Sequence, residues 1–382
     1  MKLVEDKKIP WITGIKGIAA LLVFFHHFFL FFYPVFCNGN STNKIVNIII
    51  KTPLNIFSYA GNSSVCLFYL ISGFLISYTY FYINNKNQKI SSIFKRYFQL
   101  AIPILLSSII IYIILKSEIF RTETFVNLYS QNGFNNYYKD FNMNFFNVIK
   151  SSFYDIFATG NSVINPPLWT MKNELIFSIT TMLILSTFGK NKNRIYIYLF
   201  LILFFPDSYL SCFIFGVILL ELFVNKNDLL EKINRTDIKI IILLFGLYLS
   251  SYTYLSAQSK YYSLLNFDLG NLDKNVVYHG LGTMLIMLFI LLSKRTQKIL
   301  SNKIFIKLGN LSLNIYLFHW IVINTISMYI VYKLLSIFGY FVSVLISFII
   351  STFITIIVSK YFDKYIKNIT KFFCNKIIKK LN

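Results

Sequence analysis

Two ionisable side chains interrupt the first apolar stretch of the chain, where such a group is costly and therefore most often functional. Lys16 and His27 are eleven residues apart. In an α-helix this spacing puts both on one face, about 16 Å apart along the axis. A histidine in such a place can take a proton from an alcohol and return it to a leaving group. The structural alternatives are a Lys16 that reaches lipid headgroups and a His27 packed against a carbonyl group. The packed role is the one expected of His26, which points about 100° away.

A second polar group opens the apolar stretch that begins near residue 165. Two prolines suit the first turn of a helix, and Thr170 and Glu174, four residues apart, then share a face. Glu174 is predicted to lie at a depth similar to that of His27, where a carboxylate can orient a histidine base. Lys172 lies on another face, from which it can reach outward or serve a partner.

A third group lies near the end of the chain. Ser312, Tyr316 and His319 follow one another at i, i+4 and i+7, which makes a polar stripe on an apolar helix. The alternative is that they only hydrogen-bond neighbouring helices. In the second apolar stretch, Ser72 precedes Gly73, and close helix packing explains this pair completely on physical grounds.

Composition indicates that the elements carrying these groups span a membrane. Of the 382 residues, 56% are hydrophobic and 14% charged, against about 25% charged in a soluble domain. One soluble core could not bury so much apolar surface. The net charge of +22 lies in short clusters between the apolar runs. This favours anionic membrane lipids over nucleic acid as the partner. The four cysteines have no spacing typical of a metal site.

The sequence predicts an all-α, polytopic membrane protein of about ten transmembrane helices, each of roughly 20 mostly apolar residues. The predicted spans are 12–33, 58–83, 97–115, 167–188, 194–206, 208–224, 238–256, 276–293, 309–332 and 335–359. With the N-terminus in the cytoplasm, the inner segments carry 26 Lys and Arg against nine outside. This bias predicts that both termini face the cytoplasm.

Two segments outside the predicted spans have a character of their own. The loop 116–166 is predicted to face outward, where it could cover a cavity. Residues 1–359 form the predicted membrane domain, and 360–382 a basic amphipathic helix on the inner surface. The simpler interpretation of this tail is an anchor. Glu221, near the inner end of one span, and His279, near the outer end of another, fit a structural or a functional role equally.

In this order and spacing, the motifs resemble those of the acyltransferase 3 family of integral membrane acyltransferases. The family includes bacterial O-antigen and other surface-glycan O-acetylases. Its first helix has Arg or Lys, ten residues and then His, which Lys16 and His27 resemble. Three further segments are similar to its later motifs over nearly the whole chain: Leu67–Ile76, Leu168–Thr170 with Glu174, and Leu308–Ser312 with Tyr316 and His319.

The resemblance implies transfer of an acyl group, usually acetyl, from acyl-CoA to a hydroxyl of a carbohydrate at the bacterial inner membrane, without a metal. It implies that His27 is the catalytic base with Glu174 beside it, and that Lys16 and Arg96 bind the donor acetyl-CoA. Six other residues would be substrate-binding or supporting: Ser72, Trp169, Thr170, Ser312, Tyr316 and His319. His319 and Glu174 are alternative candidates for tuning His27.

The chain departs from the family pattern at two positions. Lys16 replaces the commoner Arg, which loses the two-pronged recognition of phosphate. Leu100 stands where members often have another Arg three residues before a proline, here Pro103. Both changes bear on how the donor binds.

A proton-coupled transporter or flippase of a glycan precursor is the alternative function for the same Lys, His and Glu groups. The lack of an internal inverted repeat argues against it. A membrane scaffold, in which His27 and Glu174 are both dispensable, is a further alternative. The sequence leaves open the acceptor glycan, the acyl group, a direct or two-step transfer, and the oligomeric state.

Overall fold

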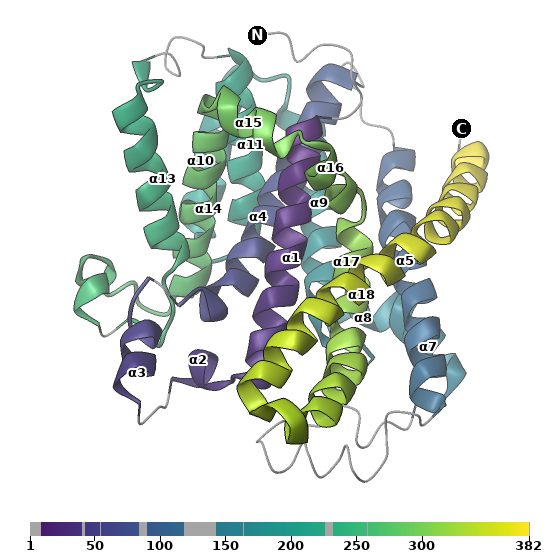
Figure 1. The fold of residues 1–382 in the computed structure, drawn as a ribbon. Coiled ribbons are helices and arrows are strands. Elements are labelled where there is room, and N and C mark those ends of the chain that lie inside the picture. The colour runs from purple at the N-terminus through teal and green to yellow at the C-terminus, as the bar shows by residue number, and fades with distance from the viewer. Residues whose placement is uncertain are drawn as a thin grey trace. The chain divides into compact units, whose positions relative to one another are not determined.

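The computed structural model describes residues 9–39, 43–53, 55–83, 90–117, 143–162, 164–225, 232–257 and 259–381, which contain helices and no strand (Figure 1). Most of the predicted outer loop and parts of the basic segments lie outside these residues. The longer helices are α1 (Pro10–Phe32), α4 (Ile56–Tyr78), α5 (Ile90–Lys116), α9 (Thr170–Phe188), α10 (Arg194–Phe204), α11 (Tyr209–Asn225), α13 (Thr236–Ser250), α14 (Lys274–Leu292), α17 (Ser312–Val322) and α18 (Met328–Leu381). Short helices and helical turns connect them: α2 (Val35–Asn38), α3 (Lys44–Ile50), η1 (Thr79–Ile83), α7 (Phe145–Lys150), η2 (Ser151–Asp155), α8 (Ile156–Ala158), η3 (Pro166–Trp169), η4 (Lys260–Leu265), α15 (Lys294–Leu300), α16 (Lys303–Asn310) and η5 (Ile323–Ser327).

Within the described residues, five helical segments are long and apolar enough to cross a membrane: Pro10–Phe32, Ile56–Ile83, Ser91–Lys116, Lys274–Leu292 and Ser312–Lys376. Helices α10 and α11 are apolar but shorter. The chain is therefore an all-α, polytopic membrane protein, as the sequence predicted. A helix also occupies each of the predicted apolar runs. The number of about ten crossings and the cytoplasmic position of both termini stay predictions.

The break between the last two predicted spans lies later than the sequence indicated. The prediction ended one span at residue 332 and began the next at 335. The structure continues the helix to Gly339, whose φ of 70° turns the chain inside α18. Glycine adopts such a φ without the steric cost that a Cβ would bring. The predicted tail 360–382 then continues α18 as far as Leu381.

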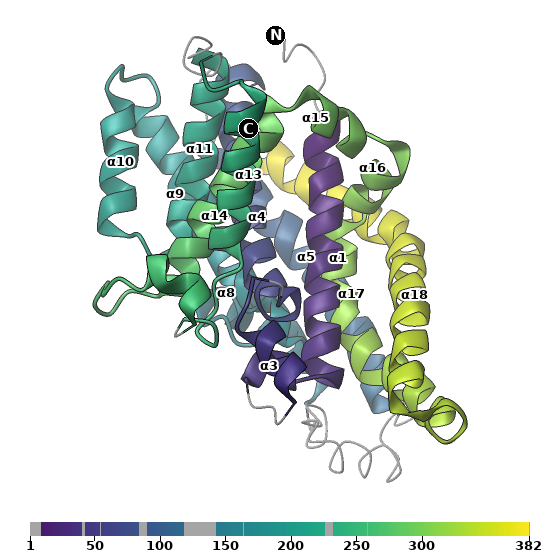
Figure 2. The same cartoon turned by 60° about the vertical axis from the view of Figure 1, so that its left-hand side comes forward.

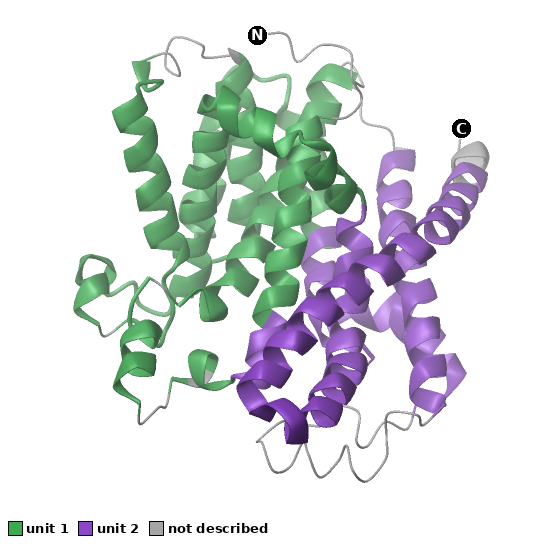
Figure 3. Cartoon of the chain, viewed as in Figure 1, with its two compact units in different colours: residues 1–26, 34–90, 176–310 green, residues 27–33, 91–175, 311–382 purple. Residues whose placement is uncertain are grey.

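The chain divides into two compact units, which are described separately (Figure 3). Unit 1 comprises residues 1–26, 34–90 and 176–310, and unit 2 comprises residues 27–33, 91–175 and 311–382. The boundary therefore falls inside α1, between His26 and His27.

Unit 1 is built around α4, α11 and α14, which pack on one another (Figure 2). Glycine makes the approach of α4 and α11 possible. A Cβ added to Gly73 would lie 2.0 Å from the carbonyl oxygen of Phe213, and one added to Gly216 would lie 2.0 Å from that of Leu70. The glycine beside Ser72 is therefore a packing position, which agrees with the physical explanation of this pair.

Unit 2 is held together by a ladder of small hydroxyl side chains on α18. Its members recur every fourth residue and are buried: Ser343, Ser347, Ser351, Thr355 and Ser359. Ser347 Oγ donates to the Ser327 carbonyl at 2.8 Å, and Ser327 Oγ donates to Ser351 Oγ at 2.7 Å. Small hydroxyl residues let helices approach closely inside a membrane while their polar atoms stay bonded. Ser347 and Ser351 thus tie α18 to η5, while Ser343 and Thr355 donate to carbonyl oxygens of α18 itself.

We predict that Ser351→Leu lowers the free energy of unfolding by about 2 kcal/mol, because a larger side chain cannot fit this close contact. Ser351→Ala, which removes only the hydroxyl, should cost about 0.6 kcal/mol. The measurement is unfolding of the purified protein in detergent. Phe353→Leu, on the exposed side of α18, is the control and should change little. Ser351→Leu unfolding like wild type would contradict the role of the ladder.

Candidate active site

Two histidines from distant parts of the sequence meet in unit 2. α1 supplies His27 and α17 supplies His319, and His319 Nε2 lies 3.0 Å from His27 Nδ1. The ring centroids are 5.0 Å apart. His319 is fully buried, whereas His27 is half-buried. The structure thus places His319, one of the two residues predicted to tune His27, in direct contact with it.

The hydrogen bonds around His319 determine which ring nitrogens carry protons. His319 Nδ1 lies 2.7 Å from the backbone carbonyl oxygen of Tyr316, and a carbonyl oxygen only accepts, so Nδ1 is the donor. In a neutral imidazole the other nitrogen, Nε2, is then an acceptor. The proton between the rings therefore belongs to His27 Nδ1, and the basic lone pair of neutral His27 is on Nε2.

The stretch that leads into α9 anchors α17 beside the histidines. The Tyr316 hydroxyl donates to the carbonyl oxygen of Pro167. Thr170 Oγ1 lies 2.7 Å from the Tyr316 hydroxyl oxygen, and it also donates to the Pro167 carbonyl oxygen at 3.2 Å. Asn165 Nδ2 donates to the carbonyl oxygen of Leu317 at 2.7 Å. The polar residues predicted on α9 and on α17 are thus brought together.

Arg96 of α5 and Glu174 of α9 form an ion pair in unit 2. Their side chains are 23% and 11% exposed, so the pair is largely shielded from solvent. The sequence prediction gave them separate roles, Arg96 on the donor and Glu174 in catalysis. Glu174 is one helical turn from Thr170, so the ion pair fastens α5 to the helix whose first residue bonds Tyr316.

Four further residues that the sequence predicted belong to α1, α4, η3 and α17. Trp169 is 40% exposed, and Ser312 is buried at the start of α17. Lys16 and Ser72 are half-buried on α1 and α4 of unit 1. Within the described residues no group of three or more His, Cys, Asp and Glu side chains could hold a metal ion.

Two residues of the cluster, Trp320 and Asn165, were not predicted from the sequence. The Trp320 ring stands edge-on to the His27 ring at 5.5 Å and 89°, and the buried Asn165 bonds α17 as described. Trp320 directly follows His319, and Asn165 directly precedes the proline pair. These positions next to motif residues are the feature of the sequence that could have identified Trp320 and Asn165.

The other histidines have structural partners in unit 1. His26 Nδ1 donates to the carbonyl oxygen of Phe57 at 2.7 Å, which is the packed role expected of it. His279 is buried; its Nε2 donates to the carbonyl oxygen of Tyr252 at 2.7 Å, and its Nδ1 accepts from Asn62 at 2.8 Å. These contacts favour the structural interpretation of His279.

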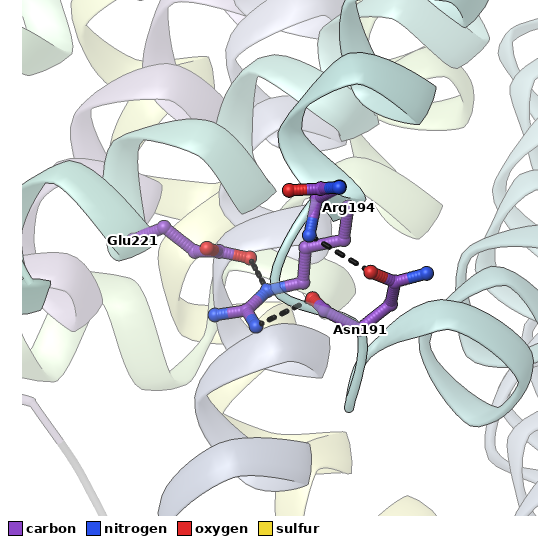
Figure 4. A network of polar contacts seen from close by, with 4 residues as sticks. Asn191, Arg194 and Glu221 are labelled. Atoms are coloured by element: carbon purple, nitrogen blue, oxygen red, sulfur yellow. Dashed lines mark hydrogen bonds and ion pairs between the residues drawn. The ribbon is translucent and has the colours of Figure 1, made fainter.

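Glu221, which the sequence left open, pairs with Arg194 in unit 1 (Figure 4). Arg194 Nε donates to Glu221 Oε1 at 2.7 Å, and Arg194 Nη1 donates to the carbonyl oxygen of Asn191 at 3.1 Å. The guanidinium also lies 5.0 Å from the centre of the Phe81 ring. These contacts tie the start of α10 to α11, which is a structural role.

We predict that Glu174→Gln lowers the free energy of unfolding by about 3 kcal/mol, because it removes the carboxylate from a shielded Arg96. The charge exchange Arg96→Glu with Glu174→Arg should recover part of this loss. Unfolding in detergent measures both effects. Asp155→Asn is the matched control, since it breaks the exposed pair with Lys150 and should cost less than about 1 kcal/mol. Equal effects of Glu174→Gln and Asp155→Asn would contradict the assignment.

Comparison with known proteins adds one finding to this geometry. Residues 9–360 match the model of the acyltransferase 3 family, which is described as an acyltransferase domain. No curated protein and no solved structure matches the chain. The family match covers most of the sequence and both compact units. The chain belongs to the acyltransferase 3 family and is a membrane acyltransferase, with an acyl donor and an acceptor as its substrates.

Proposed function

We propose that this acyltransferase transfers an acetyl group from acetyl-CoA to a hydroxyl of a cell-surface carbohydrate at the bacterial inner membrane, with His27 as the general base. The observation that carries the proposal is the contact between His27 and the buried His319. A base must present a lone pair in a fixed direction. The hydrogen-bond chain from the Tyr316 carbonyl supports this, because it puts the basic lone pair of His27 on Nε2.

The proton moves as follows in a direct transfer. His27 Nε2 takes the proton of the acceptor hydroxyl while the hydroxyl oxygen attacks the carbonyl carbon of the thioester. The new C–O bond forms, the C–S bond breaks, and the sulfur of CoA takes the proton from His27 Nε2. His27 is positively charged between these events. His319 Nε2, which accepts from His27 Nδ1, stabilises that charge as the carboxylate does in a Ser-His-Asp triad.

The ion pair of unit 2 bears on which residues we propose to bind the acyl donor. Arg96 is bonded to Glu174, which supports a positioning role for both residues. Lys16, on the same helix as His27, is then the principal donor-binding cation of the proposal. The carbohydrate acceptor and the acetyl group rest on the resemblance to glycan O-acetylases. Thr170 and Tyr316 are proposed to hold His319 in place rather than to contact substrate.

We predict that His27→Ala lowers kcat by at least about 100-fold, because the base is lost. His319→Ala should lower kcat by about 10-fold to 100-fold with the KM for the donor nearly unchanged, because the base remains but its charged form is less stable. Purified protein, labelled acetyl-CoA and a glycan acceptor give these values. His26→Gln is the matched control, and its kcat should remain close to that of wild type.

Mass spectrometry of surface glycans identifies the acceptor. A strain without the protein, and the same strain carrying His27→Ala, should both lack one acetyl group on each modified sugar. Equal turnover by wild type and His27→Ala in the purified assay would overturn the role of His27. Movement of a glycolipid across reconstituted vesicles without consumption of acetyl-CoA would instead favour the transport alternative.

A further inference from the structure

The segment between α14 and α17, most of which lies between the predicted spans 276–293 and 309–332, is folded into the two short helices α15 and α16. Ser293 begins α15, with its Oγ accepting from the Thr296 N–H at 3.3 Å. Gln297 Nε2 donates to the carbonyl oxygen of Ile290 at 2.9 Å. This carbonyl lies in the last turn of α14, where the backbone oxygens have no hydrogen-bond partner within the helix. Asn302 Oδ1 accepts from the Ile304 N–H at 3.0 Å at the start of α16. The segment is therefore a folded element with capping side chains at the start of both short helices.

Both short helices lie directly against the first half of α1 within unit 1 (Figures 1 and 2). A Cβ added to Gly14 would lie 1.9 Å from the carbonyl oxygen of Leu300, and one added to Gly309 would lie 1.7 Å from that of Thr13. Only glycine permits backbones to approach so closely. After Lys16, a Cβ added to Gly17 would lie 2.6 Å from the backbone nitrogen of Gly309. Close contacts at Gly14 and at Gly17 thus flank Lys16 in the sequence, so α15 and α16 pack on the stretch of α1 that carries it.

The exposed surface of this helix pair is strongly basic. All five of its cations are exposed, and residues 294–310 contain no Asp or Glu. The cations are Lys294, Arg295, Lys298, Lys303 and Lys307. Lys294 and Lys298 are spaced i, i+4 on α15, and Lys303 and Lys307 are spaced i, i+4 on α16. Like charges at this spacing destabilise a helix. A bound polyanion would remove that cost on both helices at once.

We infer that α15 and α16 dock the phosphate groups of the nucleotide end of the acyl-CoA donor. The inference rests on the proposed function, which supplies a donor whose nucleotide carries three phosphate groups. A molecule with several charges held close together matches two neighbouring lysine pairs better than single lipid headgroups do. The exposed lysines and arginine of α15 and α16 form this proposed phosphate dock. It adjoins the stretch of α1 that carries Lys16, so the nucleotide would be held beside the cation that we propose to bind the donor.

The test compares two donors that differ only in the nucleotide. Acetyl-CoA carries the phosphates, and S-acetylpantetheine carries the same thioester without them. In the double variant Lys303→Gln, Lys307→Gln we compare kcat/KM for acetyl-CoA with kcat/KM for S-acetylpantetheine. We expect the ratio of the two to fall about 10-fold, because two exposed charge contacts with the phosphates are lost. Lys303→Arg with Lys307→Arg should retain the ratio. Lys190→Gln with Lys192→Gln is the matched control, because it removes two exposed lysines from another segment of unit 1.

Binding of coenzyme A itself separates this inference from the proposed function. The Lys303→Gln, Lys307→Gln variant should bind coenzyme A about 10-fold more weakly than the control variant, whatever acceptor is supplied. An unchanged donor ratio and unchanged coenzyme A affinity, with normal transfer from acetyl-CoA by wild type, would overturn the dock and leave the proposed function standing. Weaker binding to phosphatidylglycerol vesicles with both donor readouts unchanged would overturn it in favour of a lipid surface. Failure of wild type to use acetyl-CoA, with coenzyme A affinity equal in both variants, would overturn both proposals.

Discussion

The hydrogen bond between His27 and His319 is the contact on which the candidate site depends. Polar groups inside a membrane find no water, so each must find its partner within the protein. The Tyr316 carbonyl accepts from His319 Nδ1, so neutral His319 carries its proton there. His319 Nε2 is then an acceptor, so neutral His27 carries its proton on Nδ1. In a low dielectric such a chain is strong when every member is satisfied and costly when one is missing. The same constraint that stabilises the cluster thus also determines which ring nitrogen of neutral His27 carries the lone pair.

The rest of unit 2 holds this chain in register. The Tyr316 hydroxyl is bonded to the Pro167 carbonyl and to Thr170, which lies one turn from Glu174 and its ion pair with Arg96. The hydroxyl ladder packs α18 against η5, which follows α17 directly. These contacts support the positioning role that we propose for Thr170, Tyr316, Glu174 and Arg96.

Local periodicity was enough to predict the helices and the shared faces within each. It predicted that Lys16 and His27 lie on one helix, and that Tyr316 and His319 share a stripe. It could not determine which residue of a distant helix meets His27, because such pairing depends on how helices pack and not on spacing along one of them. For the same reason Arg96 and Glu174 received separate roles, although the structure pairs them. The folding of α15 and α16 was missed because each is far shorter than a membrane span. The ladder from Ser343 to Ser359 has a sequence signal, a small hydroxyl residue at every fourth position.

The most direct test of the central claim is the ¹⁵N spectrum of histidine in the labelled protein in bilayers, at a pH where the rings are neutral. With only four histidines in the chain, each signal can be assigned by single substitutions to Gln. The hydrogen bonds predict that His26, His27 and His319 carry the proton on Nδ1 and that His279 carries it on Nε2. In His319→Gln, the His27 signals should move while those of His279 stay. A His27 ring protonated on Nε2 in the wild-type protein would contradict the proposed base.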